Sequence, residues 1–156
     1  MAERIIRACG GIIAGKTLAV LGLTFKPNTD DMRDSPSLAI IPALQAAGAT
    51  VRAFDPEGIG EARKHLDGVT FCANAYETME GADALVIITE WNEFRALDLA
   101  RVKALLRRPL VIDLRNIYKP ADMAEAGFHY HSVGRRVVEP RQKLQSLAKT
   151  RIRPAS

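Results

Sequence analysis

The sequence predicts an α/β fold, with a doubly wound and mainly parallel sheet of about five or six strands that has helices on both faces. Short runs rich in β-branched and aromatic residues alternate with helical patterns along the chain. The clearest strand candidate, 84–88, is apolar at every position, which is typical of a strand buried on both sides. Strands that are joined through helices pair in parallel, so these observations together indicate one layered domain.

Each expected element has a local signal. The strands are expected at 17–23, 50–54, 69–72, 84–89, 110–114 and 128–133, where apolar and β-branched residues gather. The helices are expected between them, at 2–9, 37–47, 57–66, 97–106 and 121–126. Gly48 and Gly127 end two of these helices, because glycine adopts the left-handed conformation that stops a helix. Ser35 is the expected N-cap of the helix that Pro36 opens.

Asp55 ends the second expected strand and has two interpretations. Dinucleotide-binding folds hold a ribose with an acidic residue at this place, so Asp55 is a candidate cofactor ligand. Asp55, Pro56 and Glu57 also form a good helix start, with Asp55 as the N-cap. We favour the capping role, because the glycine fingerprint of a dinucleotide site is absent: Gly22 is the single glycine of the turn after the first strand.

A phosphate-binding motif at residues 10–17 is excluded by its context. The sequence GGIIAGKT fits the pattern G-x-x-x-x-G-K-[ST] at every position. Such a loop needs a strand before it and a helix after it, so that backbone N–H groups converge on the phosphates. Here the order is reversed, since 2–9 is helical and Thr17 opens a strand. Lys16 therefore belongs to a turn, and an ATPase or GTPase is not expected.

Length and composition describe one globular domain. The 156 residues are 47% hydrophobic and 26% charged. The apolar runs are too short to cross a bilayer and residues 1–4 lack the apolar core of a signal peptide, so we expect a cytoplasmic protein. Cys9 and Cys72 occur in unrelated contexts, so neither a disulfide nor a cysteine metal site is expected.

The net charge of +4 comes from the C-terminal residues. Residues 135–156 contain seven Lys or Arg and one Glu, which leaves the rest of the chain with a slight negative charge. The body is therefore not a surface for nucleic acid or membranes. We expect 135–156 to be a poorly ordered, solvated basic tail; a functional basic arm is the alternative.

The loop after the first strand is the first candidate for a ligand site. Ligands of open parallel sheets bind outside the carboxyl ends of the strands, and this loop places Lys26 and Arg33 there. The two cations favour an anionic, phosphate-bearing ligand. The alternative is a surface loop in which Asp30, Asp31 and Asp34 pair with its own basic residues.

Three separated motifs carry a resemblance to a known family. GLTFKPNTDDMRDSP follows the first strand, ADALVIITEWNEF spans 83–94, and VIDLRNIY spans 111–118. In this order they resemble the C-terminal, UDP-sugar-binding domain of the UDP-glucose/GDP-mannose dehydrogenase family, and look closest to its UDP-glucose 6-dehydrogenases. The resemblance runs from about residue 4 to about residue 135 and implies a Rossmann-like fold.

The resemblance implies that other functional parts of the enzyme precede this segment. In the family, an NAD-binding domain, a connecting helix and a nucleophilic cysteine come first, and two NAD molecules oxidise UDP-glucose to UDP-glucuronate through a thioester on that cysteine. On this basis residues 1–14 are the end of the connecting helix and 15–134 the UDP-sugar-binding domain. The family cysteine lies in a Gly-Gly-x-Cys setting that neither Cys9 nor Cys72 matches. No catalytic residue is therefore assigned, and the chain alone is expected to be inactive.

The resemblance also assigns binding roles residue by residue. Phe25, Lys26 and Arg115 match positions that hold the UDP-sugar, and Arg33 matches a position that reaches NAD across the domain cleft. All four follow the carboxyl ends of the first and fifth expected strands, where cations offset the charge of a diphosphate. Two structural alternatives remain open: Arg115 pairs with Asp113 or Asp98, or Phe25 belongs to the core.

Three further groups have simpler interpretations. Glu90 and Trp91 follow the fourth strand and line the cleft or face the other domain, with packing favoured for Trp91. Asp30 and Asp31 are expected to brace their loop, because a metal site needs a third ligand. His129 and His131 share one face of the last strand, where an exposed edge is favoured over a metal site.

Two classes of function remain after the sequence analysis. The first is the UDP-binding domain of a dehydrogenase, with the NAD-binding domain as partner and a homo-oligomeric enzyme expected. The second is a free-standing nucleotide-sugar-binding module without catalysis. The equivalent domain of a GDP-mannose or UDP-N-acetylhexosamine dehydrogenase is a variant of the first.

Overall fold

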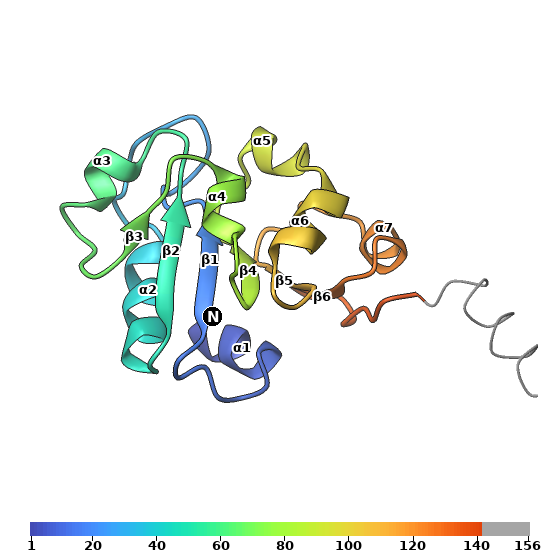
Figure 1. The fold of residues 1–156 in the computed structure, drawn as a ribbon. Helices are drawn as coiled ribbons and strands as arrows, with labels where there is room; N and C mark the ends of the chain where they lie inside the picture. Colours follow the sequence, from blue (N-terminus) through green and yellow to red (C-terminus); the bar gives the residue numbers. More distant parts are fainter. Residues whose placement is uncertain (142–156) are drawn as a thin grey trace, which may run out of the picture.

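The computed structural model describes residues 1–141 and contains a single six-stranded sheet in the order β3-β2-β1-β4-β5-β6, with every pair of neighbours parallel (Figure 1). The predicted α/β fold is therefore confirmed. The strands are β1 Thr17–Leu21, β2 Thr50–Phe54, β3 Thr70–Phe71, β4 Ala84–Ile87, β5 Leu110–Asp113 and β6 His129–Ser132. All six were predicted, and each is shorter than or equal to its expected range.

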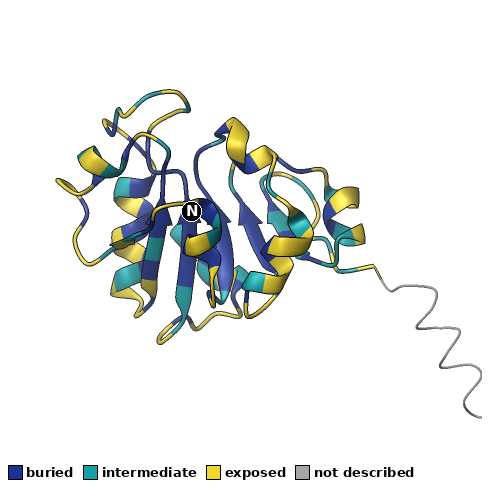
Figure 2. Ribbon diagram, turned by 45° about the horizontal axis from the view of Figure 1, so that its top comes forward, coloured by how far each residue is buried: buried dark blue, intermediate teal, exposed yellow. Residues whose placement is uncertain are grey.

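The helices lie between the strands and cover both faces of the sheet. They are α1 Ala2–Ala8, α2 Ser37–Ala46, α3 Ile59–Ala62, α4 Ala75–Met79, α5 Asn92–Arg95, α6 Leu99–Leu105 and α7 Pro120–Glu125. One buried cluster joins the sheet to α1, α2 and α3, and the other joins it to α4, α5, α6 and α7. Figure 2 shows the result: buried strands at the centre and helices with exposed outer sides.

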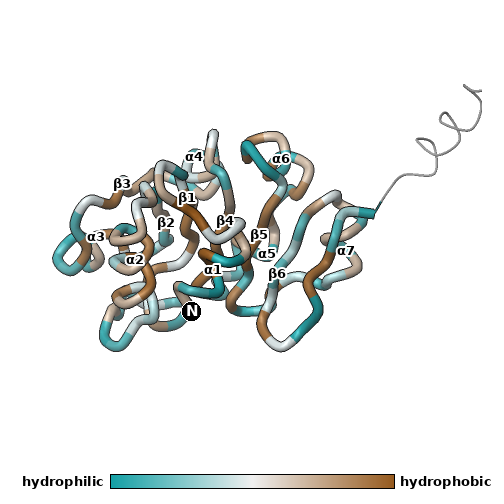
Figure 3. Tube along the Cα trace, turned by 90° about the horizontal axis from the view of Figure 1, so that it is seen from below, coloured by the Kyte–Doolittle hydropathy of each residue, from teal (hydrophilic) through white to brown (hydrophobic). Residues whose placement is uncertain are grey.

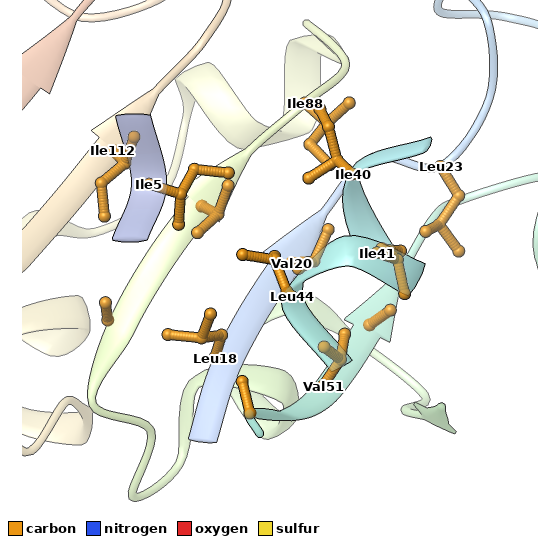
Figure 4. Packing of buried hydrophobic residues seen from close by; sticks show 14 of the residues in the cluster. Ile5, Leu18, Val20, Leu23, Ile40, Ile41, Leu44, Val51, Ile88 and Ile112 are labelled. Atoms are coloured by element: carbon orange, nitrogen blue, oxygen red, sulfur yellow. The ribbon is translucent and has the colours of Figure 1, made fainter. Parts of the chain in front are cut away.

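Alternate residues of β1 supply the two clusters. Leu18 and Val20 pack on the α1 and α2 side, whereas Ala19 and Leu21 pack on the opposite side, because successive side chains of a strand point to opposite faces. All four are fully buried. In Figure 4 the apolar face of α2, with Ile40, Ile41 and Leu44, lies over this first face. Figure 3 shows hydrophobic stretches along the strands and hydrophilic ones in the outer loops.

Two helices were not predicted and one is shorter than expected. α4 and α5 have five and four residues, too few for a helical pattern of apolar residues to appear. A local signal for α4 does exist: the side chain of Asn74 accepts a hydrogen bond of 2.8 Å from the backbone N–H of Glu77, as an N-cap does. The predicted helix 57–66 is reduced to α3: it begins only after Gly58, and residues 63–65 form turns instead of continuing the helix.

The chain after β6 returns along that edge strand. Tyr130 and Val138 exchange two backbone hydrogen bonds of 2.9 Å in an antiparallel bridge. Arg135 donates to the hydroxyl oxygens of Ser132 and Tyr130. Residues 135–141, which we assigned to the basic tail, thus contact β6, and residues 142–156 of that tail lie outside the described residues. No helix among residues 1–141 has the length and apolar character needed to cross a membrane.

Gly22 allows the carboxyl ends of β1 and β4 to approach each other. Its φ is +91°, and a Cβ atom there would lie 2.5 Å from both the Cβ and the backbone N of Thr89. Backbone atoms cannot move away cheaply, so only glycine fits. The tight approach brings the loops after β1 and β4 together at this edge of the sheet.

We expect Gly22→Ala to lower the free energy of unfolding by about 2–5 kcal/mol, the sum of overpacking and a left-handed alanine. Gly81→Ala is the matched control, because Gly81 has a φ of +72° with no atom within 4 Å of the added Cβ. The control should lose about 1–2 kcal/mol. Urea unfolding measures both variants, and equal losses would show that the contact with Thr89 is unimportant.

Candidate functional site

The loop after β1 is fastened at its base by buried hydroxyl groups. Ser35 and Ser37 both donate from their side chains to the carbonyl oxygen of Leu23, at 2.6 and 2.7 Å. Thr24 is also buried, and its carbonyl accepts a hydrogen bond of 2.7 Å from the hydroxyl of Thr89. α2 begins at Ser37, and Pro36 before it already has a helical conformation. The hydroxyl oxygen of Ser35 also accepts a hydrogen bond of 3.3 Å from the backbone N–H of Ser37, so Ser35 is the N-cap that was predicted and closes the loop as well.

Phe25 and Lys26 lie at the outer end of this loop and point into solvent. Phe25 is 48% exposed, so the alternative that placed it in the core is wrong. Its backbone N–H donates to the carbonyl of Asp31 at 2.9 Å, which joins the two limbs of the loop. Within residues 1–141 the ammonium group of Lys26 forms no ion pair. An exposed ring next to an uncompensated cation can receive a planar, anionic ligand.

Arg33 pairs with a carboxylate of its own loop. Its Nη2 lies 3.0 Å from Oδ2 of Asp31, and its Nε donates to Oδ1 at 3.1 Å. This hydrogen-bonded guanidinium lowers the pKa of Asp31 to about 2. The alternative of a self-paired loop is therefore realised at Arg33, and Asp31 braces the loop as predicted. The Arg33 side chain is nevertheless 89% exposed, and water screens such a surface pair.

Asp55 is buried and connects three loops. Its Oδ1 accepts from the N–H groups of Glu57 and Gly58, at 3.0 and 2.8 Å. Its Oδ2 accepts from the backbone N–H groups of Leu23 and Thr24, at 2.7 and 3.1 Å, and from Nε1 of Trp91 at 3.2 Å. The favoured capping role is seen, although Asp55 caps the turn before α3, which itself begins at Ile59. The bonds from Asp55 to the loops after β1 and β4 were not predicted, because no local pattern of residues indicates them.

Arg115 forms an ion pair that was not predicted. Its Nε and Nη2 donate to the two carboxylate oxygens of Glu90, the second at 3.1 Å. The side chain of Asp113 accepts from the backbone N–H of Arg115, at 3.0 Å. Pairing with Asp113 or Asp98 through the guanidinium is therefore wrong, and Glu90 is the partner. The hydrogen bond from Arg115 lowers the pKa of Glu90, so the pair is charged at neutral pH.

Asp113 is a second buried carboxylate at this edge, and sequence analysis missed its role. Its Oδ2 accepts from the N–H groups of Ile117 and Tyr118, at 2.8 and 3.3 Å, and from the hydroxyl of Tyr130 at 2.6 Å. Burial and the neighbouring Asp113 carboxylate raise the pKa of Tyr130. The signal in the sequence was an aspartate at the end of an otherwise apolar strand.

The named residues lie at one edge of the sheet but do not all meet. Phe25 and Lys26 follow β1, whereas Arg115 follows β5, and the end of β4 with Glu90 lies between them. Two hollows flank the loop after β1. One, of about 540 Å³, is lined by Asn28, Thr29, Asp30, Glu57 and Trp91. The other, of about 490 Å³, is lined by Thr29, Asp30, Asp31, Met32, Arg33, Leu38, Glu61 and His65.

Lys16 has no place in this site. Its Nζ donates to the carbonyl oxygen of Cys9 at 2.8 Å, so it satisfies the C-terminal end of α1. The order helix, turn, strand is as predicted, and it confirms that residues 10–17 do not form a phosphate-binding loop. The motif lies before β1, at the edge of the sheet opposite to Lys26.

The other sequence candidates have structural partners. Nδ1 of His129 contacts the carboxylate of Glu139, and Trp91 is buried, as expected for packing. Cys9 and Cys72 are buried free thiols. In the described part of the chain no group of three His, Cys, Asp or Glu residues is arranged to hold a metal ion.

Comparison with known proteins supports a specific family. A model of the UDP-glucose/GDP-mannose dehydrogenase family, UDP binding domain, matches residues 19–120. The UDP-glucose 6-dehydrogenase of Rhizobium meliloti (strain 1021) is 57% identical over 135 residues, which are 86% of this chain and 31% of that protein. The UDP-glucose 6-dehydrogenase TuaD of Bacillus subtilis (strain 168) is 45% identical over 149 residues, 89% of this chain and 32% of that protein.

Solved structures agree with the sequence matches. The NDP-N-acetyl-D-galactosaminuronic acid dehydrogenase from Methanosarcina mazei Go1 superimposes with a TM-score of 0.72 at 28% identity, over 85% of this chain and 27% of that one. The UDP-glucose dehydrogenase from Pyrobaculum islandicum gives 0.62 at 32% identity, over 72% and 24%. The chain spans about a third of the length of the curated relatives that it matches.

Asp55→Asn should destabilise the fold by about 2–4 kcal/mol, because the amide turns a donor toward N–H groups that are buried and have no other acceptor. Asp67→Asn is the control, since Asp67 is exposed and should change by less than about 0.5 kcal/mol. Chemical unfolding followed by the fluorescence of Trp91, the single tryptophan, reports both stability and the loss of its bond to Asp55. An unchanged stability of Asp55→Asn would mean that water replaces the carboxylate.

Proposed function

Because the chain belongs to the UDP-glucose/GDP-mannose dehydrogenase family, in which it matches the UDP binding domain, we propose that it binds the UDP part of UDP-glucose at the carboxyl edge of its sheet. The observation that supports this most directly is the exposed pair of Phe25 and Lys26. The ring offers a flat apolar surface, and the ammonium group, free of ion pairs in residues 1–141, offers charge to a diphosphate.

Arg115 and Arg33 complete the proposed assignment. Arg115 follows β5 on the same edge as Lys26, so the diphosphate is proposed to lie across the end of β4, between the two cations. A charged hydrogen bond of this kind contributes about 1.5–3 kcal/mol. Arg33 lies on the far limb of the loop with its side chain in solvent, and is proposed to reach NAD across a domain cleft.

We propose that the full-length enzyme oxidises UDP-glucose to UDP-glucuronate. Two molecules of NAD, each accepting one hydride, supply the oxidising power, and they are proposed to bind mainly outside this chain. The nucleophile is proposed to lie outside it as well, since Cys9 and Cys72 are buried and burial raises the pKa of the Cys9 thiol. In this proposal the residues of the chain bind and orient the substrate. A homo-oligomeric full-length enzyme and a cytoplasmic location belong to the same proposal.

The chain should bind UDP and UDP-glucose weakly, and Lys26→Ala should reduce the affinity about ten- to a hundredfold through loss of one charged contact. Isothermal titration calorimetry measures the dissociation constants, with GDP and ATP as competing nucleotides. Lys16→Ala is the matched control and should bind like the unmodified chain, because Lys16 lies at the opposite edge. Preference for ATP, abolished by Lys16→Ala, would instead restore the rejected phosphate-loop hypothesis.

The chain alone should not reduce NAD in the presence of UDP-glucose, because its two cysteines, Cys9 and Cys72, are both buried. Absorbance at the NADH band is the measurement, and a full-length relative serves as the positive control. Turnover by the pure chain that disappears in Cys72→Ala would place the chemistry in this domain and contradict the proposal.

Arg33 and Lys26 should affect different ligands in a full-length enzyme that carries this domain. Arg33→Ala should raise KM for NAD about tenfold or more with a smaller effect on UDP-glucose, whereas Lys26→Ala should do the reverse. Steady-state kinetics with each substrate varied in turn separates the two. If each variant raises KM for NAD and KM for UDP-glucose equally, the loop matters only for folding, and the assignment of Arg33 to NAD and Lys26 to UDP-glucose is wrong.

A further inference from the structure

Glu90 holds Arg115 along one defined edge of its guanidinium group. Nε and Nη2 of Arg115 each donate to a different oxygen of the Glu90 carboxylate, so the pair is bidentate. Glu90 follows β4 and Arg115 follows β5, and these strands are neighbours in the sheet. The Arg115 and Glu90 side chains are 37% and 24% exposed, so both are partly withdrawn from water.

The bidentate pair leaves part of Arg115 free. A guanidinium group has five N–H donors, and two of them point to Glu90. The three that remain include both hydrogens of Nη1, together with the second hydrogen of Nη2. Nη1 and Nη2 form the end of the side chain, and this end can still donate hydrogen bonds to two oxygens of a phosphate. Glu90 and a phosphate can therefore bind the same guanidinium at the same time.

The backbone at Arg115 is fixed as firmly as its side chain. Asp113 accepts from the N–H of Arg115. The next residue, Asn116, adopts a left-handed φ of +55° and exchanges two hydrogen bonds with the backbone of Val133, at 2.8 and 2.9 Å. With both the backbone and the Nε edge held, few conformations of the guanidinium group remain, and less conformational entropy is lost when a ligand binds.

We propose that Glu90 is a positioning residue that orients the free end of Arg115 toward the diphosphate, an inference that rests on the proposed UDP-binding function. A carboxylate beside an anion site repels the ligand, so its presence there needs a compensating effect. Orientation of the cation supplies this compensation. Glu90 could have two other roles, which make different predictions. If Glu90 competed with UDP for Arg115, the pair would have to break before UDP binds. If Glu90 only stabilised the local structure, its effect on UDP affinity would be the same with or without Arg115.

The test is a double-mutant cycle on UDP affinity, measured by calorimetry on the full chain. Glu90→Gln keeps the shape of the side chain but loses its charge, and should weaken UDP binding about three- to tenfold. In the Arg115→Met background the same change should cause no loss. Glu93→Gln is the matched control, because Glu93 is an exposed carboxylate on α5, three residues further along. Glu93→Gln should leave the affinity for UDP unchanged or raise it slightly.

Each outcome decides between the three roles. Tighter UDP binding by Glu90→Gln would show a competitor, and an equal loss in both backgrounds would show a brace; either overturns the proposal. A second measurement needs no ligand: the Nε–H signal of Arg115 in ¹⁵N spectra should be visible in the unmodified chain and Glu93→Gln, and broadened in Glu90→Gln. Absence of UDP binding by the unmodified chain would overturn the proposed function, whereas normal binding that Glu90→Gln leaves unchanged overturns this inference alone.

Discussion

Buried carboxylates at the carboxyl ends of the strands are the constraint on which the rest of the structure depends. Where parallel strands end, their backbone N–H groups lose their partners in the sheet, and a buried N–H without an acceptor is costly. Asp55 accepts from backbone N–H groups after β1 and β2 and from the indole N–H of Trp91 after β4, and Asp113 accepts from backbone N–H groups of the turn after β5. The loops that carry the proposed ligand contacts are thus built on two buried aspartate side chains.

The two carboxylates also explain which parts of the fold could be predicted from the sequence. The strands were predictable because their signal is local: buried, apolar and β-branched residues in short runs. The helices α4 and α5 were not, since four or five residues carry no periodicity. Asp55 was correctly assigned as a cap from the three residues beside it. Its bonds to Leu23 and Trp91 span 32 and 36 residues, and no local pattern reports contacts over such distances.

For the candidate site the sequence predicted the cations, the edge and, as an alternative, the pairing of Arg33 within its own loop, but not the partner of Arg115. Lys26, Arg33 and Arg115 were named from motifs, and the structure places all three after strand ends. Glu90 pairs with Arg115 from the neighbouring strand, and such a pairing depends on strand order, which the residues alone do not specify. The three cations consequently differ: Lys26 is unpaired within residues 1–141, Arg33 is paired with Asp31 but remains 89% exposed, and Arg115, paired with Glu90, is only 37% exposed.

In one stretch of four residues, the first two stabilise the fold and the last two are free to contact a ligand. Leu23 and Thr24 are fully buried and bonded to Asp55, whereas Phe25 and Lys26, directly after them, lie in solvent. The exposed pair makes few contacts that the fold needs, so its residue types can be selected for a ligand. The buried pair fixes the position from which they project, because Asp55 ties it to two other strands. The buried residues Leu23 and Thr24 thus hold the exposed ligand contacts in place, and a change of Phe25 or Lys26 leaves the packing of the core intact.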